Sequence, residues 1–311
     1  MAENSIRSMF VVNPASANGH TRKAWLKLEK HLKQNNITFE VSMTSRPLQA
    51  IELTRQALRN GFEHIIAVGG DGTLNEVVNG FFDEQGIFIN KSACLSMIPM
   101  GTGGDFARMM KFSNRPENIV RLFLNPQAVA CDLVQVAFTN WQGEPCIRYF
   151  INIADVGLGS DTVFRVNRNS KFMGGPLSFL VGAVTSIIAF KNLSLRVIID
   201  DQNVYAGDSC LVAIGNGQYF GGGMKVTPRA VINDGLLDII VVEGLGKVEL
   251  MSNIVPIRKG DHLKNPRVHY YTGKKVIIES GNNLYFEMDG EAPGQGNLKF
   301  EILPAAMNLI V

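Results

Sequence analysis

Hydrophobic and polar residues alternate in blocks along the first 130 residues. Short apolar runs, which predict strands, are separated by stretches in which apolar residues recur at helical spacing. The predicted strands are 9–12, 37–43, 64–68 and 94–98. Helices are predicted for 21–35, for 47–60 with Gly61 just past the end, and from Thr73, where the apolar positions 74, 77, 78, 81 and 82 share one face. This alternation predicts βαβ units and a parallel, Rossmann-like sheet, whose ligands bind at the carboxyl ends of the strands.

The pattern changes near residue 131. Strand-like runs dominate from there, many of them β-branched or alternating, with Gly, Asn and Asp between them. Only 173–190 and 247–259 have a helical pattern. We therefore predict an α/β N-terminal domain over 1–130, completed by the C-terminal segment 304–311, and a C-terminal β-sandwich domain over 131–303.

The segment 173–190 contains 18 residues without a charge, which is the lower limit for a membrane span. Its first turn holds Gly174, Gly175 and Pro176, so about 14 apolar residues remain for a helix. This length favours a buried core helix or an interfacial helix, and a membrane span is the alternative.

Composition and charge narrow the class of protein. Hydrophobic residues make up 46% of the 311 residues and charged residues 19%, as in a folded globular protein. The net charge of +2 gives no basic field for nucleic acid. The N-terminus lacks an apolar signal region, and the four cysteines lack metal-binding spacing. These features predict reduced thiols and a cytoplasmic protein that does not bind nucleic acid.

Two glycine-rich loops follow predicted strands. In "GGDGTLNEVVNG" (69–80), Gly69, Gly70 and Gly72 let backbone approach a ligand, and Thr73 to Glu76 reads as a T-x-x-E capping box. A helix start of this kind can bind phosphate, although Thr73 and Glu76 could serve only as caps. The loop matches neither the dinucleotide fingerprint nor the P-loop. Asp71 would repel a phosphate, so we interpret it as a magnesium-side ligand, direct or through water.

The second loop is "PMGTGGDFAR" (99–108). Thr102 offers a hydroxyl and Asp105 a carboxylate near the same sheet edge. The alternative is a glycine turn with Asp105 as a helix cap.

Two Asp-Gly turns carry further carboxylates. In "DGE" (289–291), Glu291 or Asp289 could act as a general base, and the alternative is a simple hairpin. In "VINDGLLDI" (231–239), Asp234 could bind a hard cation together with backbone carbonyls.

Five motifs together resemble the bacterial diacylglycerol-kinase-like lipid kinases, which are related to sphingosine kinases. The resemblance runs nearly end to end and rests on "NPAS" (13–16), "GGDGTLNEVVNG" (69–80), "PMGTGGDFAR" (99–108), "GGGMKVTPRAVINDGLLDI" (221–239) and "DGE" (289–291). The GGDGT motif alone is shared with NAD kinases and phosphofructokinases.

The resemblance implies a kinase that uses ATP and Mg²⁺ to phosphorylate a lipid hydroxyl. The implied acceptor is of the diacylglycerol, acylglycerol, phosphatidylglycerol or sphingoid type. Glu291 would be the general base, with Asp289 beside it and Asp71 at the phosphates. The implied nucleotide-binding residues are Asn13, Thr44, Gly69, Gly70, Asp71, Gly72, Thr73, Asn75 and Thr102. A structural magnesium would be held by Asp234 and the carbonyls of Val231 and Leu236.

This chain departs from the family pattern at two places. Gly104 stands where the family usually has Asn, and Ala17 and Asn18 move the usual phosphate-facing lysine out of register, which leaves Arg22 and Lys23 as candidates. An NAD kinase-like enzyme and an inactive nucleotide or lipid sensor therefore stay as alternatives. A lipid substrate also implies peripheral membrane contact, while the sequence leaves the lipid and the oligomeric state, such as a homodimer, open.

Overall fold

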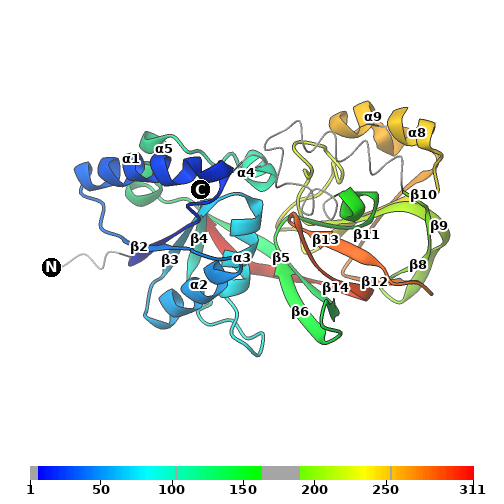
Figure 1. Ribbon diagram of the computed structural model, residues 1–311, viewed down its shortest axis with the longest axis horizontal. Coiled ribbons are helices and arrows are strands. Elements are labelled where there is room, and N and C mark those ends of the chain that lie inside the picture. Colours follow the sequence, from blue (N-terminus) through cyan, green and yellow to red (C-terminus); the bar gives the residue numbers. More distant parts are fainter. Residues whose placement is uncertain (1–5, 102–103, 163–189, 253) are drawn as a thin grey trace. The chain divides into compact units, whose positions relative to one another are not determined.

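The computed structural model describes residues 6–101, 104–162, 190–252 and 254–311 (Figure 1). The chain forms two compact units, Met1–Cys131 with Ala305–Val311, and Asp132–Pro304. Strands β5 (Ala128–Asn140) and β14 (Glu291–Ile310) each run from one unit into the other.

The first unit contains four parallel strands in the order β2-β1-β3-β4. These strands are β1 (Ser8–Val12), β2 (Glu40–Met43), β3 (His64–Gly69) and β4 (Cys94–Pro99). The end of β14 pairs in parallel with β4 through Asn308 and Leu309. The four strands lie close to the positions that the apolar runs predicted.

Helices cover both faces of this sheet (Figure 1). Helices α1 (His20–Gln34) and α5 (Pro116–Leu124) lie on one face, and α2 (Gln49–Arg59) and α3 (Asp71–Gly80) on the other. Phe10 of β1, Trp25 of α1 and Ile119 of α5 belong to one buried cluster. Burial of such apolar side chains between helix and sheet stabilises the unit and fixes where the strands end.

The second unit consists mainly of antiparallel strands. They are β6 (Pro145–Phe150), β7 (Ile153–Gly157), β8 (Leu193–Ile199), β9 (Gln202–Gly215), β10 (Leu237–Glu243), β11 (Val268–Gly273), β12 (Lys275–Glu279) and β13 (Tyr285–Met288). Strand pairing forms a closed circuit, β9-β8-β12-β14-β13-β7-β9, in which every pair is antiparallel. Phe286 and Phe300 belong to the buried apolar cluster that these strands enclose. The chain thus forms the predicted β-rich domain.

Short helices cover β10 in the second unit. Helices α8 (Lys247–Ser252) and α9 (Ile254–Lys259) pack Leu250 and Ile257 against a buried cluster that includes Ile240 and Val242. The predicted helix over 173–190 lies outside the described residues except for Phe190. Among the described helices, none has both the length and the apolar character needed to span a membrane. The four cysteines are free thiols, as predicted.

Candidate active site

The predicted nucleotide-binding residues of the first unit gather where its strands end. Asn13 follows β1 and donates its backbone N–H to Val68 O (2.9 Å), and Thr44 follows β2 and donates to Val12 O (2.9 Å). Met100 follows β4 and donates to Gly69 O (2.8 Å). The structure therefore brings these residues to one edge of the sheet. Thr102 lies outside the described residues.

The two glycine-rich loops contact each other through their backbones. A Cβ atom added to Gly101 would lie 2.6 Å from Gly70 Cα, and one added to Gly69 would lie 2.4 Å from Thr73 Oγ1. A side chain at Gly101 would therefore collide with the neighbouring loop, and one at Gly69 with Thr73 of its own loop. Thr73 Oγ1 also accepts a hydrogen bond from Asn13 Nδ2 (3.0 Å), which ties the first strand end to the start of α3.

The start of α3 differs from the predicted capping box. The helix begins at Asp71, with Gly70 as its N-cap, so Glu76 lies six residues into the helix and cannot reach back to the cap. Its carboxylate instead accepts the backbone N–H groups of Leu48 and Ala50, each at 3.0 Å, and so caps α2. The capping-box prediction was wrong because the N-cap is Gly70, three residues before Thr73.

Asp71 connects the two glycine-rich loops. Its Oδ2 accepts the N–H groups of Gly104 (2.9 Å) and Asp105 (3.2 Å) and so caps helix α4 (Asp105–Met110). Its Oδ1 is buried and has no hydrogen-bond partner among the described residues. Burial, together with the nearby Asp105 carboxylate, raises the pKa of Asp71. The unpartnered oxygen fits a hard cation such as Mg²⁺, or a water bound to one.

Gly104 adopts a left-handed conformation (φ 64°) at the N-cap of α4. Asn is the other residue that tolerates this conformation well, so the glycine preserves the backbone that an asparagine would have here. Asp105 pairs with Arg108 in the first turn of α4 and does not act as the N-cap. The loop can therefore fold without the usual family residue at position 104.

Lysine is also absent from its usual place in the loop after β1. Ala17, Asn18 and Gly19 all have positive φ there, and Ser16 Oγ and Thr21 Oγ1 hydrogen-bond to Met100 O. Arg22 and Lys23 are exposed on α1. The loop contacts the second glycine-rich loop through hydroxyl groups.

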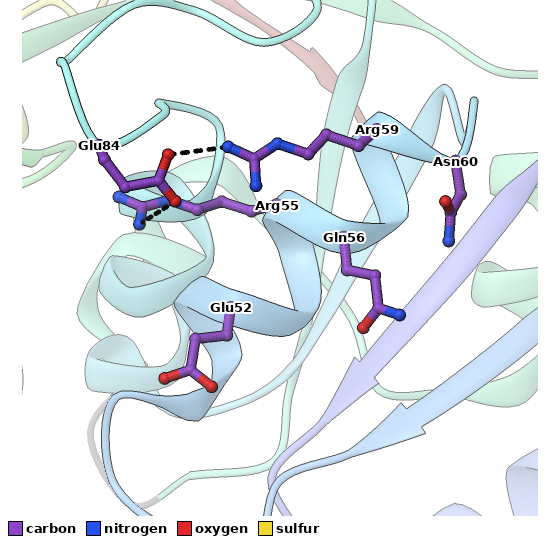
Figure 2. A pocket seen from close by; sticks show the side chains of 6 residues that line it. All are labelled: Glu52, Arg55, Gln56, Arg59, Asn60 and Glu84. Carbon is purple, nitrogen blue, oxygen red and sulfur yellow. Dashed lines mark hydrogen bonds and ion pairs between the residues drawn. The ribbon is translucent and has the colours of Figure 1, made fainter.

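The polar pocket at α2 has a volume of about 290 Å³ and is lined by Glu52, Arg55, Gln56, Arg59, Asn60 and Glu84. Figure 2 shows Glu84 paired with both arginines, at 3.3 Å from Arg55 and 2.8 Å from Arg59. Since both cations already have a carboxylate partner, this pocket is a poor anion site.

In the second unit, the DGE motif forms a two-residue hairpin between β13 and β14. Asp289 and Gly290 have φ values of 48° and 85°, as in a type I′ turn, and Met288 pairs with Glu291. The Asp289 carboxylate accepts the backbone N–H groups of Ile151, Asn152 and Ile153 at 3.1–3.2 Å. Asp289 thus anchors the turn, and Glu291 follows as a half-buried residue at the start of β14.

A pair of buried carboxyl groups lies beside this hairpin, and sequence reasoning missed it. Asp155 of β7 and Glu287 of β13 are cross-strand partners with 0% and 1% exposure. Burial raises the pKa of Asp155 to about 7 and that of Glu287 well above its usual value. The available signal was an acidic residue inside each of the apolar runs "INIADVG" and "LYFEMDGE".

The loop predicted to hold a structural cation is polar, but some of its carboxylate oxygens already accept backbone hydrogen bonds. Asp234 is exposed, and its Oδ1 accepts the N–H of Leu236 (3.0 Å). The buried Asp132 accepts the N–H of Gly235 through Oδ2 (2.7 Å). Oδ2 of Asp234 and the carbonyls of Val231 and Leu236 are hard oxygen donors of the kind that Mg²⁺ uses, together with water. Within the described ranges, no three acidic, His or Cys side chains form a metal cluster.

Comparisons with known proteins identify the family of this chain. Residues 7–136 match the model of the diacylglycerol kinase catalytic domain, and residues 154–311 match that of the YegS C-terminal NAD kinase beta sandwich-like domain. The probable lipid kinase YegS-like of Yersinia pestis (strain Pestoides F) is 31% identical, over 89% of this chain and 88% of its own. The chain belongs to the diacylglycerol kinase and YegS-like lipid kinase family. Its enzyme class is that of kinases with an alcohol acceptor.

Other family relatives and solved structures extend this similarity. The diacylglycerol kinase of Staphylococcus carnosus is 28% identical, over 93% of this chain and 90% of its own. A diacylglycerol kinase structure from Bacillus anthracis has a TM-score of 0.73 at 21% identity and covers 99% of this chain and 97% of its own. Yeast NADH kinase has a TM-score of 0.55 at 10% identity, with 99% and 83% covered. At such identities, the two structures support the fold alone.

Proposed function

We propose that the protein transfers the γ-phosphoryl group of ATP to a lipid hydroxyl in a Mg²⁺-dependent reaction. The observation that carries this proposal is the contact between the two glycine-rich loops, with the buried Asp71 Oδ1 beside them. The N–H groups that begin α3 have no acceptor within the helix, and they suit phosphate oxygens. We infer that a Rossmann-like domain over 1–130 binds ATP and that the β-sandwich over 131–303 binds the lipid.

The chemistry is an in-line displacement. The lipid oxygen forms a bond to the γ-phosphorus as the bond to the bridging oxygen breaks, and ADP leaves with the electron pair. Glu291 accepts the proton of the hydroxyl. Asn13, Thr44, Gly69, Gly70, Gly72, Thr73, Asn75 and Thr102 bind the nucleotide. Mg²⁺ bound with ATP neutralises phosphate charge, and Asp71 would hold it through Oδ1. Asp234, with the carbonyls of Val231 and Leu236, would hold a structural magnesium.

Glu291→Gln tests this assignment, since glutamine keeps the size of the side chain but cannot accept the proton. The variant should lose at least roughly 100-fold in kcat with labelled ATP and diacylglycerol in mixed micelles. Glu301→Gln, a change of a half-buried residue on the same strand β14 that removes an ion pair with Lys275, is the matched control and should keep wild-type kcat. Equal turnover in both variants would show that Glu291 is not the general base.

We propose that the protein is cytoplasmic and contacts a membrane surface through α8 and α9. Their inward residues pack on the core, whereas Val248, Met251 and Val255 are 85%, 51% and 63% exposed. Lys247, Arg258 and Lys259 flank this apolar face and form no ion pair with described residues. An apolar face with cations beside it suits an anionic bilayer, where the lipid substrate resides.

An NAD kinase-like activity is the second candidate, because the fold resembles yeast NADH kinase. Incubation with NAD and ATP tests it directly. Phosphorylated NAD as the main product would favour this candidate over the lipid kinase.

A further inference from the structure

The buried Asp155–Glu287 pair takes no part in the proposed reaction, yet it adjoins the proposed base. Each carboxyl group has one oxygen committed to a backbone N–H. Asp155 Oδ1 accepts the N–H of Ser160 (2.8 Å), and Glu287 Oε2 accepts the N–H of Gly290 (2.8 Å). Gly290 is the turn residue directly before Glu291. Glu287 therefore holds the end of the hairpin from which Glu291 extends.

The other oxygen of each carboxyl group indicates that a proton lies between Asp155 and Glu287. Asp155 Oδ2 and Glu287 Oε1 are both buried, and neither has a donor among the described residues. The two residues are direct partners on neighbouring strands, so a proton on one of these open oxygens would let it donate to the other carboxyl group. Two bare carboxylates would repel each other strongly at this depth. Among the described residues, the other charged group that acts on Glu287 is Asp289, which is also acidic.

We propose that Asp155 and Glu287 share one proton and that this protonated pair positions the general base Glu291. The two open oxygens, Glu287 Oε1 and Asp155 Oδ2, hold this proton between them, while Glu287 Oε2 holds Gly290. Asp155 and Glu287 are thus positioning residues that act through the 289–290 turn. This inference rests on the proposed function only where it concerns Glu291.

The arrangement predicts an unusual pattern among amide variants. In Glu287→Gln, the amide nitrogen replaces the proton donor and the amide oxygen still accepts from Gly290. In Asp155→Asn, the new amide donates to Glu287 Oε1 while its oxygen still accepts from Ser160. The double variant either directs two NH₂ groups at each other or, when one amide is flipped, leaves one backbone N–H without its acceptor. Each single variant should unfold near the wild-type temperature, and the double variant should unfold roughly 5 °C or more below either.

The shared proton also sets a pH dependence. Free glutamate titrates near 4.5, and the folded pair keeps its proton to well above that pH. Above pH 4.5 the folded protein thus binds more protons than the unfolded chain. The free energy of unfolding therefore falls as pH rises towards the pKa of the folded pair. Between pH 5 and 8, the thermal midpoint of the wild type should fall relative to that of Glu287→Gln. Glu301→Gln, the matched control, should follow the wild type.

The decisive experiment combines infrared spectroscopy with kinetics on the full chain. The wild type at pH 7 should show the C=O band of a protonated carboxyl group, and Glu287→Gln should lack it. The wild-type kcat should decline at alkaline pH, where the pair loses its shared proton. Glu287→Gln should keep most of the wild-type kcat at pH 7 and should not show this decline. Glu287→Ala, which releases Gly290, should lose roughly 10- to 100-fold in kcat at unchanged KM for ATP.

Two results would overturn the shared proton: absence of the infrared band from the wild type, or a double variant as stable as the singles. Identical pH profiles of kcat for wild type and Glu287→Gln would overturn the positioning role. Failure of the proposed function is a separate result, namely full turnover by Glu291→Gln while the infrared band remains.

Discussion

At the scale of single residues, Asp71 shows how one carboxylate can serve two purposes. One oxygen caps α4 through Gly104 and Asp105, and the other is buried without a partner among the described residues. A residue needed only for the cap would not need a charge, because a neutral amide oxygen accepts the same N–H groups. The unpartnered oxygen is the reason why we propose a cation beside Asp71.

Asp71→Asn and Asp71→Ala separate these two purposes. Asparagine keeps the cap and removes the charge, so the variant should fold normally but lose roughly 10- to 100-fold in activity at a given Mg²⁺ concentration. Alanine should lose the same activity and in addition about 1 kcal/mol of stability. Magnesium titrations of phosphoryl transfer, together with thermal unfolding, measure both effects. If Asp71→Asn showed the magnesium dependence of the wild type, Asp71 would serve only to cap α4.

At the scale of elements, Glu76 joins two helices on one face of the first sheet. Glu76→Ala removes the acceptor for the N–H groups of Leu48 and Ala50, so it should destabilise the protein by about 1 kcal/mol. Glu84→Ala is the control, because Glu84 makes only exposed ion pairs with Arg55 and Arg59 (Figure 2). Chemical denaturation should show a lower midpoint for the first variant and little change for the second. Equal midpoints would show that the cap contributes nothing.

The contact between the glycine-rich loops gives a second prediction at this scale. A Cβ at position 101 would meet backbone atoms of Gly70, which cannot move aside as a flexible side chain can. Gly101→Ala should therefore shift both loops and weaken ATP binding at least roughly tenfold. Gly281→Ala, which has open space around it, should bind ATP like the wild type. Calorimetric titration with ATP compares the two, and equal affinities would contradict the loop contact.

Local sequence patterns predicted the elements better than the contacts between them. The runs at 64–68 and 94–98 correspond closely to β3 and β4, because continuous apolar runs mark buried strands. The Asp-Gly pair at 289–290 forms the predicted hairpin. The partner of Glu76 could not be predicted, since it lies 26–28 residues away and depends on how α2 packs on α3. The Asp155–Glu287 pair likewise depends on strand register, which no single run determines.

At the scale of the whole molecule, we propose that α8 and α9 bring the enzyme to the membrane surface where a lipid substrate resides. Val248→Asp with Met251→Asp places charge on the exposed face of α8 and should reduce sedimentation with anionic vesicles several-fold. Ile87→Asp, which changes another exposed apolar residue in the first unit, is the matched control and should sediment like the wild type. Unchanged sedimentation of the α8 variant would show that this face does not bind the membrane.

The central claim is phosphoryl transfer from ATP to a lipid hydroxyl. Its most direct test is incubation of the full chain with γ-labelled ATP, Mg²⁺ and a lipid extract, followed by mass spectrometry of every labelled product. We expect label in a lipid phosphate monoester with the wild type, and none with Glu291→Gln. Label in phosphorylated NAD when NAD is added, or no labelled lipid from any extract, would contradict this function.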